Sequence, residues 1–327
     1  MRFEIVGGGA IGLLYGARLA LAGYPVTIWT RTRKQAELLS DEGIELVAGG
    51  TIHTIDVSAS PITECSRPVE RTSEHKVLLI TVKQPQLTAV LLEYIRLIAE
   101  EGDIVVGLQN GVGHIESIQH SLPGRIVLAG VTTEGALRHG LRTVEHTGEG
   151  VLSIGEYRST SLTEASGDEL LSQSDRMIRE SRQKMLMNAL SKAGIAIELS
   201  NEMNNRVYQK LLVNAVINPL TALFDVRNGE LVHHPARLSL MKALHEETLS
   251  VLTASGMDDD GTSWDRLLQV CDRTSGNISS MLSDVRAGRL TEIEWINGGV
   301  CRLADDAGVN ASLNRSVMHM VQAMFKS

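Results

Sequence analysis

The stretch Phe3-Glu-Ile-Val-Gly-Gly-Gly-Ala-Ile-Gly12 decides the fold of this chain. An apolar run, Phe3 to Val6, leads into a G-x-G-x-x-G pattern, and a helical repeat of apolar residues follows until Gly23. In such a unit the first glycine permits a tight turn, the second lets a pyrophosphate approach, and the third allows close packing of helix on strand. The N-terminus of the helix attracts the anion. The stretch therefore predicts a Rossmann-type domain whose cofactor-binding residues are Gly7, Gly8, Gly9, Ala10, Ile11 and Gly12.

The next predicted strand, Pro25 to Thr30, ends at Arg31. Folds that bind NAD place a carboxylate there for the ribose 2′-hydroxyl, whereas an arginine pairs with a 2′-phosphate. Arg33 and Lys34 add positive charge next to it. The pattern favours NADP(H) as the cofactor, and the alternative is that Arg31 is an ordinary solvated loop residue.

Two more buried parallel strands are predicted at 76–82 and 103–108, with a helix over 85–99 between them. Ligands of open α/β sheets lie outside the carboxyl ends of the strands, and Lys83 and Asn110 occupy two such ends. We expect Lys83 at the cofactor and Asn110 at the nicotinamide ribose or the substrate. Asn110 also begins an Asn-Gly pair, which is an ordinary turn signal.

Short strands separated by glycine turns are predicted after residue 125, as a mixed or antiparallel edge of the same sheet. They cover 126–129, 131–133, 141–146 and 151–154. The polar segment 159–192 is predicted to be a loop followed by a solvated helix, without a chemical role. A last strand is expected at 195–199.

After Ser200 the pattern is helical almost throughout. Residues 207–224 are apolar apart from a few polar positions, among which Lys210, Asn214 and Asn218 follow at i, i+4 and i+8 and form one stripe on a helix. Burying an ammonium and two amides without partners would cost several kcal/mol, so the stripe must meet a neighbouring helix's polar groups or a polar ligand. Pro219 is expected to bend or end this helix near Asn218.

These patterns predict an α/β domain over 1–199, which binds the dinucleotide, and an all-α domain over 200–327, which supplies substrate and catalytic groups. The composition argues against a nucleic-acid partner, because the net charge is −8 and basic residues form no run. The three cysteines and the His233-His234 doublet show no metal-ligand spacing, so no metal is expected. With no leader pattern and no apolar run of 18 residues, we expect a cytoplasmic protein without a membrane span, as a monomer or homodimer.

Several polar motifs in the second half resemble those of the ketopantoate reductase (2-dehydropantoate 2-reductase) family. They are Lys210-x-x-x-Asn214-x-x-x-Asn218-Pro219-Leu-Thr-Ala, Asn228-Gly-Glu-Leu, Asn277-Ile-Ser-Ser280-Met-Leu and Thr291-Glu292-Ile-x-x-Ile-Asn297-Gly298. The glycine motif, Arg31, Asn110-Gly and Thr132-Thr133 match the same family, and the order is consistent from Met1 to about residue 310. The resemblance implies NADPH-dependent reduction of ketopantoate, a small 2-keto acid, to pantoate, in the pathway to pantothenate and coenzyme A.

The resemblance also implies roles for particular residues. Lys210 would donate the proton, and Glu292 would bind the substrate hydroxyl, contact the cofactor and influence the charge of Lys210. The substrate-binding residues would be Asn110, Asn214, Asn218, Asn228, Asn277 and Ser280, with Asn110 also at the cofactor. Ser280, at the start of a helix, would bind a carboxylate.

Some alternatives remain open on the sequence alone. Glu292 could support a helix start after Thr291, and Asn277 could be the N-cap of the helix that contains Ser280. The function could be that of a related NADP-dependent 2-keto or 3-hydroxy acid dehydrogenase, or of a non-catalytic NADP-binding sensor.

Overall fold

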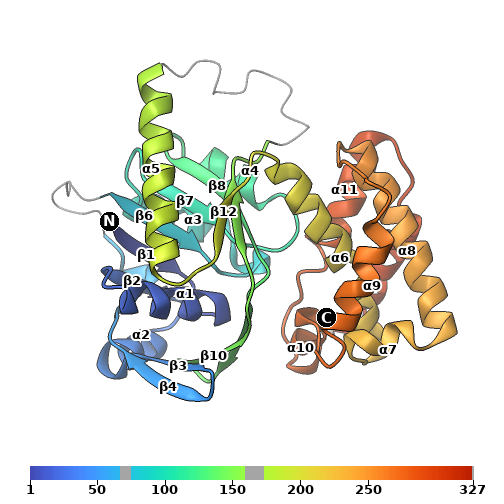
Figure 1. Ribbon diagram of the computed structural model, residues 1–327, viewed down its shortest axis with the longest axis horizontal. Coiled ribbons are helices and arrows are strands. Elements are labelled where there is room, and N and C mark those ends of the chain that lie inside the picture. The colour runs from blue at the N-terminus through green and yellow to red at the C-terminus, as the bar shows by residue number, and fades with distance from the viewer. Residues whose placement is uncertain (67–74, 159–172, 326–327) are drawn as a thin grey trace. The chain divides into compact units, whose positions relative to one another are not determined.

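The structure is a computed structural model that describes residues 1–66, 75–158 and 173–325 (Figure 1). It consists of two compact units. Among the described residues, the first contains Met1–Gln109, His114–Tyr157 and residues 173–203, and the second contains Asn110–Gly113, Arg158 and the chain from Asn204 onward. A short segment after residue 109 therefore packs with the helical unit, although the chain on both sides of it belongs to the α/β unit.

The first unit is built on an eight-stranded sheet in the order β12-β11-β8-β7-β6-β1-β2-β5. Its strands are β1 (Arg2–Val6), β2 (Val26–Thr30), β5 (Ser58–Pro61), β6 (Lys76–Ile80), β7 (Ile104–Gly107), β8 (Ile126–Thr132), β11 (Leu152–Gly155) and β12 (Ile197–Leu199). All neighbouring strands are parallel except β8 and β11. The central strands β6 and β7 are buried along their whole length, as expected for a parallel sheet that is covered on both faces. The predicted Rossmann-type fold is confirmed.

Helices connect the parallel strands. They are α1 (Ala10–Leu21), α2 (Arg33–Glu42), α3 (Ala89–Ile98), α4 (His114–Ser121) and α5 (Gln173–Lys192), with the 3-10 turns η1 (Ile62–Glu64) and η2 (Gln84–Gln86). Helix α5 is largely exposed, but its last turns bury Leu186, Ala189 and Leu190 in the core of this unit. The loop that was predicted from residue 159 lies mostly outside the described residues.

A second, four-stranded sheet in the order β4-β3-β10-β9 lies in the same unit. It is formed by β3 (Ile44–Ala48), β4 (Thr51–Ile55), β9 (Gly135–His139) and β10 (Thr143–Gly148). The predicted single sheet was wrong here, because β9 and β10 leave the large sheet and β10 pairs in parallel with β3. Residues 131–132 continue strand β8 instead of forming a separate strand. Helix α1 packs against β3, β9 and β10, so the small sheet covers the helix that follows the glycine loop.

The second unit is helical in its described residues, as predicted. Its helices are α6 (Met203–Phe224), α7 (Asn228–Val232), α8 (Pro235–Ala254), α9 (Ser263–Arg273), α10 (Ser280–Arg286), α11 (Asn297–Ala307) and α12 (Ser312–Gln322). Val216, Leu220, Met241, Leu244 and Val317 are fully buried in its core. Across the described parts of the chain, no helix combines the length and apolar character needed to cross a bilayer.

Helix α6 continues through Pro219 to Phe224, so of the two predicted effects of Pro219, a bend or an end near Asn218, the end is wrong. Proline has no N–H, which leaves the carbonyl oxygen of Ala215, four residues earlier, without its helical donor. The side chain of Asn297 replaces that donor, because its Nδ2 lies 2.9 Å from the Ala215 oxygen. Asn297 is fully buried at the start of α11, so a neighbouring helix supports α6 at its proline.

Candidate active site

The glycine loop has the geometry that its sequence predicts. Gly7 has a φ of +119°, which favours glycine, and a Cβ on Gly12 would overlap the carbonyl oxygen of Gly7. The Thr81 hydroxyl lies 2.9 Å from that same oxygen and 3.1 Å from the carbonyl oxygen of Val6. Gly12 therefore permits close packing of α1 on the loop, and Thr81 ties the loop to the end of β6.

The opposite side of the loop is open. A Cβ on Gly9 would meet no atom of the described chain within 4 Å. Gly9 is the N-cap of α1, the first turn of the helix contains no acidic residue, and no side chain caps it. The N–H groups at a helix start need acceptors, and an anion satisfies them. The loop therefore fits the pyrophosphate of a dinucleotide.

The carbonyl of Gly8 is held by two side chains that the sequence reading missed. Gln35 Nε2 donates to it at 2.8 Å and Arg138 Nη1 at 2.9 Å, and the same Gln35 nitrogen lies 2.7 Å from the oxygen of Leu141. A Cβ on Gly8 would lie 2.6 Å from Gln35 Nε2, so a larger residue there would require the end of the Gln35 side chain to move. No local pattern marks these two residues, because their partner is a backbone atom.

The predicted cofactor residues Arg31 and Lys83 lie at the end of the large sheet where the carboxyl ends of its parallel strands meet. Each follows the carboxyl end of a strand, β2 for Arg31 and the β6 segment for Lys83, and both strands are parallel to β1, which leads into the glycine loop. Arg31 is exposed and Lys83 is half-buried. Of the neighbouring cations, Arg33 forms an exposed ion pair with Glu64.

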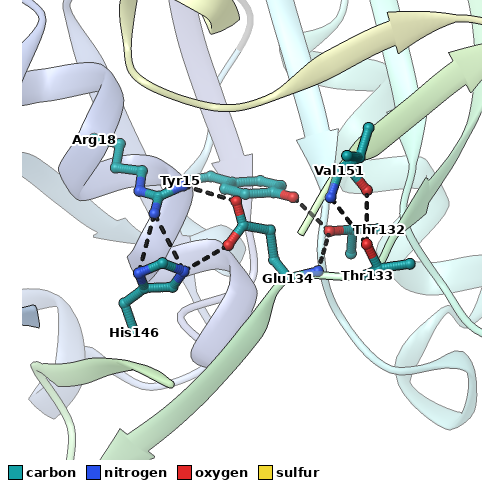
Figure 2. Close-up of polar contacts among 7 residues, drawn as sticks. All are labelled: Tyr15, Arg18, Thr132, Thr133, Glu134, His146 and Val151. Carbon is teal, nitrogen blue, oxygen red and sulfur yellow. Dashed lines mark hydrogen bonds and ion pairs between the residues drawn. The ribbon is translucent and has the colours of Figure 1, made fainter. Parts of the chain in front are cut away.

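A polar cluster anchors helix α1, the helix that follows the glycine loop in the sequence (Figure 2). The carboxylate of Glu134, only 3% exposed, accepts from Arg18 at 2.8 Å and lies 2.8 Å from His146 Nε2. Tyr15 and Thr132 share a hydrogen bond of 2.7 Å between their hydroxyls, and burial raises the pKa of Tyr15. Helix α1 is thus tied to the connection between β8 and β9 and to β10.

The family motif Thr132-Thr133 has a structural role in this cluster. Thr132 contacts Tyr15, and its Oγ1 also accepts from the backbone N–H of Glu134 at 3.1 Å. The Oγ1 of Thr133 accepts from the N–H of Val151 at 2.9 Å (Figure 2). The two threonines therefore hold the end of β8.

In the second unit, three of the predicted site residues come together. Asn110 Nδ2 donates to Glu292 Oε2 at 3.0 Å across 182 residues of sequence, and the Glu292 side chain is buried. Burial lowers the pKa of Lys210 from its ordinary 10.5 to about 8, while the charge of Glu292 opposes this shift and raises the pKa. A hydrogen bond thus joins the Asn110 amide to the Glu292 carboxylate, and the Lys210 ammonium lies close enough to interact with the charge of that carboxylate.

Asn110 is positioned by the short segment that packs with the helical unit. The N–H of Val112 donates to the carbonyl oxygen of Trp295 at 3.2 Å. Gly111 has a φ of +84°, and a Cβ there would overlap the same carbonyl. The Asn-Gly pair thus forms a turn, which was the alternative interpretation. This turn places the Asn110 side chain within hydrogen-bond distance of Glu292.

Glu292 does not support a helix start. Helix α11 begins only at Asn297, and Glu292 lies in the turn before it, where its carbonyl accepts from Trp295 and Ile296. The alternative reading of Glu292 is therefore wrong.

The polar stripe of α6 lies among buried apolar side chains. Lys210 and Asn214 are half-buried and Asn218 is 8% exposed, while Leu211, Leu212 and other apolar residues around them are buried. The stripe is therefore formed as predicted.

The remaining predicted substrate residues cluster around the segment before α10. The backbone N–H of Asn228 donates to the carbonyl of Asn277 at 3.1 Å, and Asn228 Nδ2 donates to Thr274 Oγ1 at 2.9 Å. The Oδ1 atom of Asn228 is buried and has no hydrogen-bond partner among the described residues. Asn277 and Ser280 are exposed.

Helix α10 is capped by Ser279, not by Asn277. The Ser279 hydroxyl accepts from the N–H of Leu282 at 3.1 Å and lies 2.7 Å from the hydroxyl of Thr221 on α6. The alternative reading of Asn277 as the N-cap is wrong, because Ser279 stands next to the first helical residue. The contact between Thr221 and Ser279 joins the start of α10 to α6 three residues after Asn218.

Taken together, a glycine loop in a Rossmann-type unit and a helical unit with a lysine, a carboxylate and amides define a dinucleotide-dependent dehydrogenase. Comparison with known proteins agrees. Residues 3–159 match the family described as ketopantoate reductase PanE/ApbA, and residues 202–325 match its C-terminal domain. The chain belongs to the ketopantoate reductase family, whose members are dinucleotide-dependent reductases.

Individual relatives cover nearly the whole chain. A 2-dehydropantoate 2-reductase from Bacillus subtilis is 32% identical over 95% of this chain and 93% of its own length. One from Archaeoglobus fulgidus is 32% identical over 99% of this chain and 97% of its own. The crystal structure of a probable 2-dehydropantoate 2-reductase from Bacillus subtilis is 31% identical, covers 99% of this chain and 100% of its own, and has a TM-score of 0.75. D-mandelate dehydrogenase in complex with NADH and anilino(oxo)acetate, at 22% identity, covers 99% of this chain and 98% of its own with a TM-score of 0.84, which shows a shared fold.

Proposed function

We propose that this protein reduces ketopantoate (2-dehydropantoate) to pantoate with NADPH, as a step toward pantothenate and coenzyme A. The observation that carries the proposal is the set of Asn110, Glu292 and Lys210, which the second unit brings together. A protein that only sensed NADP would have no need of an ammonium with a lowered pKa beside a buried carboxylate. Membership of the ketopantoate reductase family supports the same reaction.

Lys210 acts as the proton donor. Bound NADPH supplies a hydride to the ketone carbon, so negative charge develops on the ketone oxygen. With a pKa of about 8, Lys210 is mostly protonated at neutral pH, and it releases a proton more readily than an ordinary lysine. Its burial thus serves the reaction.

Glu292 and Asn110 position groups around Lys210. The carboxylate keeps the ammonium charged by raising its pKa, and its position is fixed by the amide of Asn110. Glu292 then accepts a hydrogen bond from the substrate hydroxyl and contacts the cofactor, and Asn110 contacts both ligands. These roles follow the family resemblance.

The other asparagines supply neutral hydrogen bonds to the substrate. The buried Oδ1 of Asn228 is an acceptor suited to a hydroxyl group, because an acceptor without a partner is costly to bury. Asn214 and Asn218 extend the stripe from Lys210, and the exposed Asn277 and Ser280 can donate to a carboxylate.

The cofactor is NADPH in this proposal, held by Gly7–Gly12, Arg31 and Lys83. The open side of Gly9 and the uncapped start of α1 support a pyrophosphate site. The exposed Arg31 after β2 supports a 2′-phosphate.

One assay tests the reaction: loss of NADPH absorbance with ketopantoate and a panel of other 2-keto acids. Faster turnover of another acid would assign a different substrate, and no turnover of any would refute the reductase. Lys210→Ala is expected to lower the rate by orders of magnitude while the Kd for NADPH, measured by calorimetry, changes little. Lys242→Ala, an exposed lysine on α8, is the control and should keep full activity.

A further inference from the structure

Arg138 is a cation at the glycine loop to which neither the sequence motifs nor the family resemblance assigned a role. It lies on β9 of the small sheet, is exposed, and its Nη1 donates to the carbonyl of Gly8 at 2.9 Å. A guanidinium stays charged at neutral pH, and its planar shape matches phosphate groups. Arg138 therefore places a positive charge beside the loop.

The register of the small sheet explains why Arg138 reaches the loop. Arg138 is opposite Val144 on β10, and paired residues of antiparallel strands share a face. Val144 is fully buried and belongs to the core cluster that includes residues of α1. The face that carries Arg138 is thus the one turned toward α1, and Arg138 stands at the end of that face, where it is exposed.

The Gly8 carbonyl also connects Arg138 to the segment that follows Arg31. The other donor to the Gly8 carbonyl is Gln35, in the first turn of α2, which begins two residues after Arg31. The chain between them is fixed, because Thr30 Oγ1 donates to the carbonyl of Thr32 at 2.9 Å and Thr32 caps the helix. Arg138 and the segment that carries Arg31 therefore approach the same carbonyl.

We propose that Arg138 binds the 2′-phosphate of NADPH together with Arg31, and is a second residue that selects NADPH over NADH. The proposal rests on the NADPH preference proposed above. A 2′-phosphate carries close to two negative charges at neutral pH, and guanidinium groups are well suited to bind it. One cation would come from the strand end of the large sheet and the other from the small sheet.

Binding measurements on the full-length protein without substrate test this role. Arg138→Ala should raise the Kd of NADPH about 10-fold, the usual order for a charged hydrogen bond that is partly exposed, and leave the Kd of NADH nearly unchanged. Adenosine 2′,5′-bisphosphate should lose affinity by the same factor, whereas 5′-AMP should not. Arg138→Lys should recover part of the loss, because it keeps the charge but not the planar donors.

The matched control is Arg142→Ala, in the turn between β9 and β10. The Arg142 guanidinium is held by Glu42 and Glu45 at 3.2 and 2.6 Å, and no described bond joins it to Gly8. The substitution therefore removes the same charge as Arg138→Ala without removing a contact to the glycine loop. It should bind both cofactors like the unchanged protein.

Two results would overturn the proposal. An equal loss of NADPH and NADH affinity in Arg138→Ala would mean that the residue only shapes the loop or contacts the pyrophosphate, and no loss would mean that it does not bind the cofactor. Failure of the proposed NADPH preference is a separate outcome: the unchanged protein would bind both cofactors equally, and Arg31→Ala would have no selective effect. If Arg31→Ala weakens NADPH binding more than NADH binding and Arg138→Ala does not, only the proposed role of Arg138 is refuted.

Discussion

The lowered pKa of Lys210 gives the proposed reaction a defined pH dependence. The ammonium must be charged to donate its proton to the ketone oxygen, and its pKa is about 8. With one titrating group, about nine-tenths of the molecules carry the proton at pH 7 and about one-tenth at pH 9. The rate of reduction at saturating substrate should therefore fall roughly tenfold between those values. Oxidation of pantoate needs the neutral amine, so its rate should rise over the same range.

A substitution of Glu292 tests the cause of this pKa. The Glu292 carboxylate raises the pKa of Lys210, so Glu292→Gln should move the break in the rate profile to lower pH. Glu294→Gln is the control, because Glu294 is exposed and pairs with Arg302. It should leave the break in place.

The assay is a series of initial rates in both directions from pH 6.5 to 9.5 at constant ionic strength. Lys210→Arg should be slow and without the break, because arginine stays charged throughout this range. A reduction rate that stays level up to pH 9.5 in the unchanged protein would refute Lys210 as the titrating proton donor. A break that does not move in Glu292→Gln would refute the coupling between the two residues.

Two further predictions concern stability. Glu134→Ala should lower the free energy of unfolding in urea by about 3–5 kcal/mol, because it leaves the largely buried guanidinium of Arg18 without its carboxylate, whereas the exposed Glu145→Ala should cost at most about 1 kcal/mol. Equal effects would show that the buried cluster does not stabilise the fold. Asn297→Ala should cost about 1–3 kcal/mol by removing the donor to the Ala215 carbonyl, and Pro219→Ala should recover part of it by restoring a helical N–H. Strictly additive effects in the double variant would contradict this compensation.

The parts of the fold that sequence predicted are those encoded by local patterns. The glycine loop follows directly on β1, and the apolar period of the second half marks its helices. The small sheet was missed because β3 and β10 are about a hundred residues apart, and β9 has no buried residue to mark it as a strand. Pairing between distant strands leaves no signal in either strand alone.

The candidate site divides in the same way. Lys210, Asn214 and Asn218 follow from helical spacing, but the pairing of Asn110 with Glu292 depends on the turn that packs with the helical unit. Gln35 and Arg138 could not be predicted from the sequence, because both donate to the backbone carbonyl of Gly8. Every residue has such a carbonyl, so the residue type at position 8 does not indicate the contact.

The contact between Gly8 and Gln35 limits how this protein can be redesigned. The second position of a G-x-G-x-x-G motif is nominally variable, but here a side chain could be accommodated only if Gln35 moved away from the Gly8 carbonyl. Among homologous proteins we expect the positions of Gly8 and Gln35 to vary together. A residue larger than glycine should occur at the position of Gly8 mainly where the residue at the position of Gln35 is small. An engineer who exchanges the segment from Arg31 to Gln35 to change cofactor preference would therefore also change a hydrogen bond that holds the glycine loop, unless Gln35 is kept.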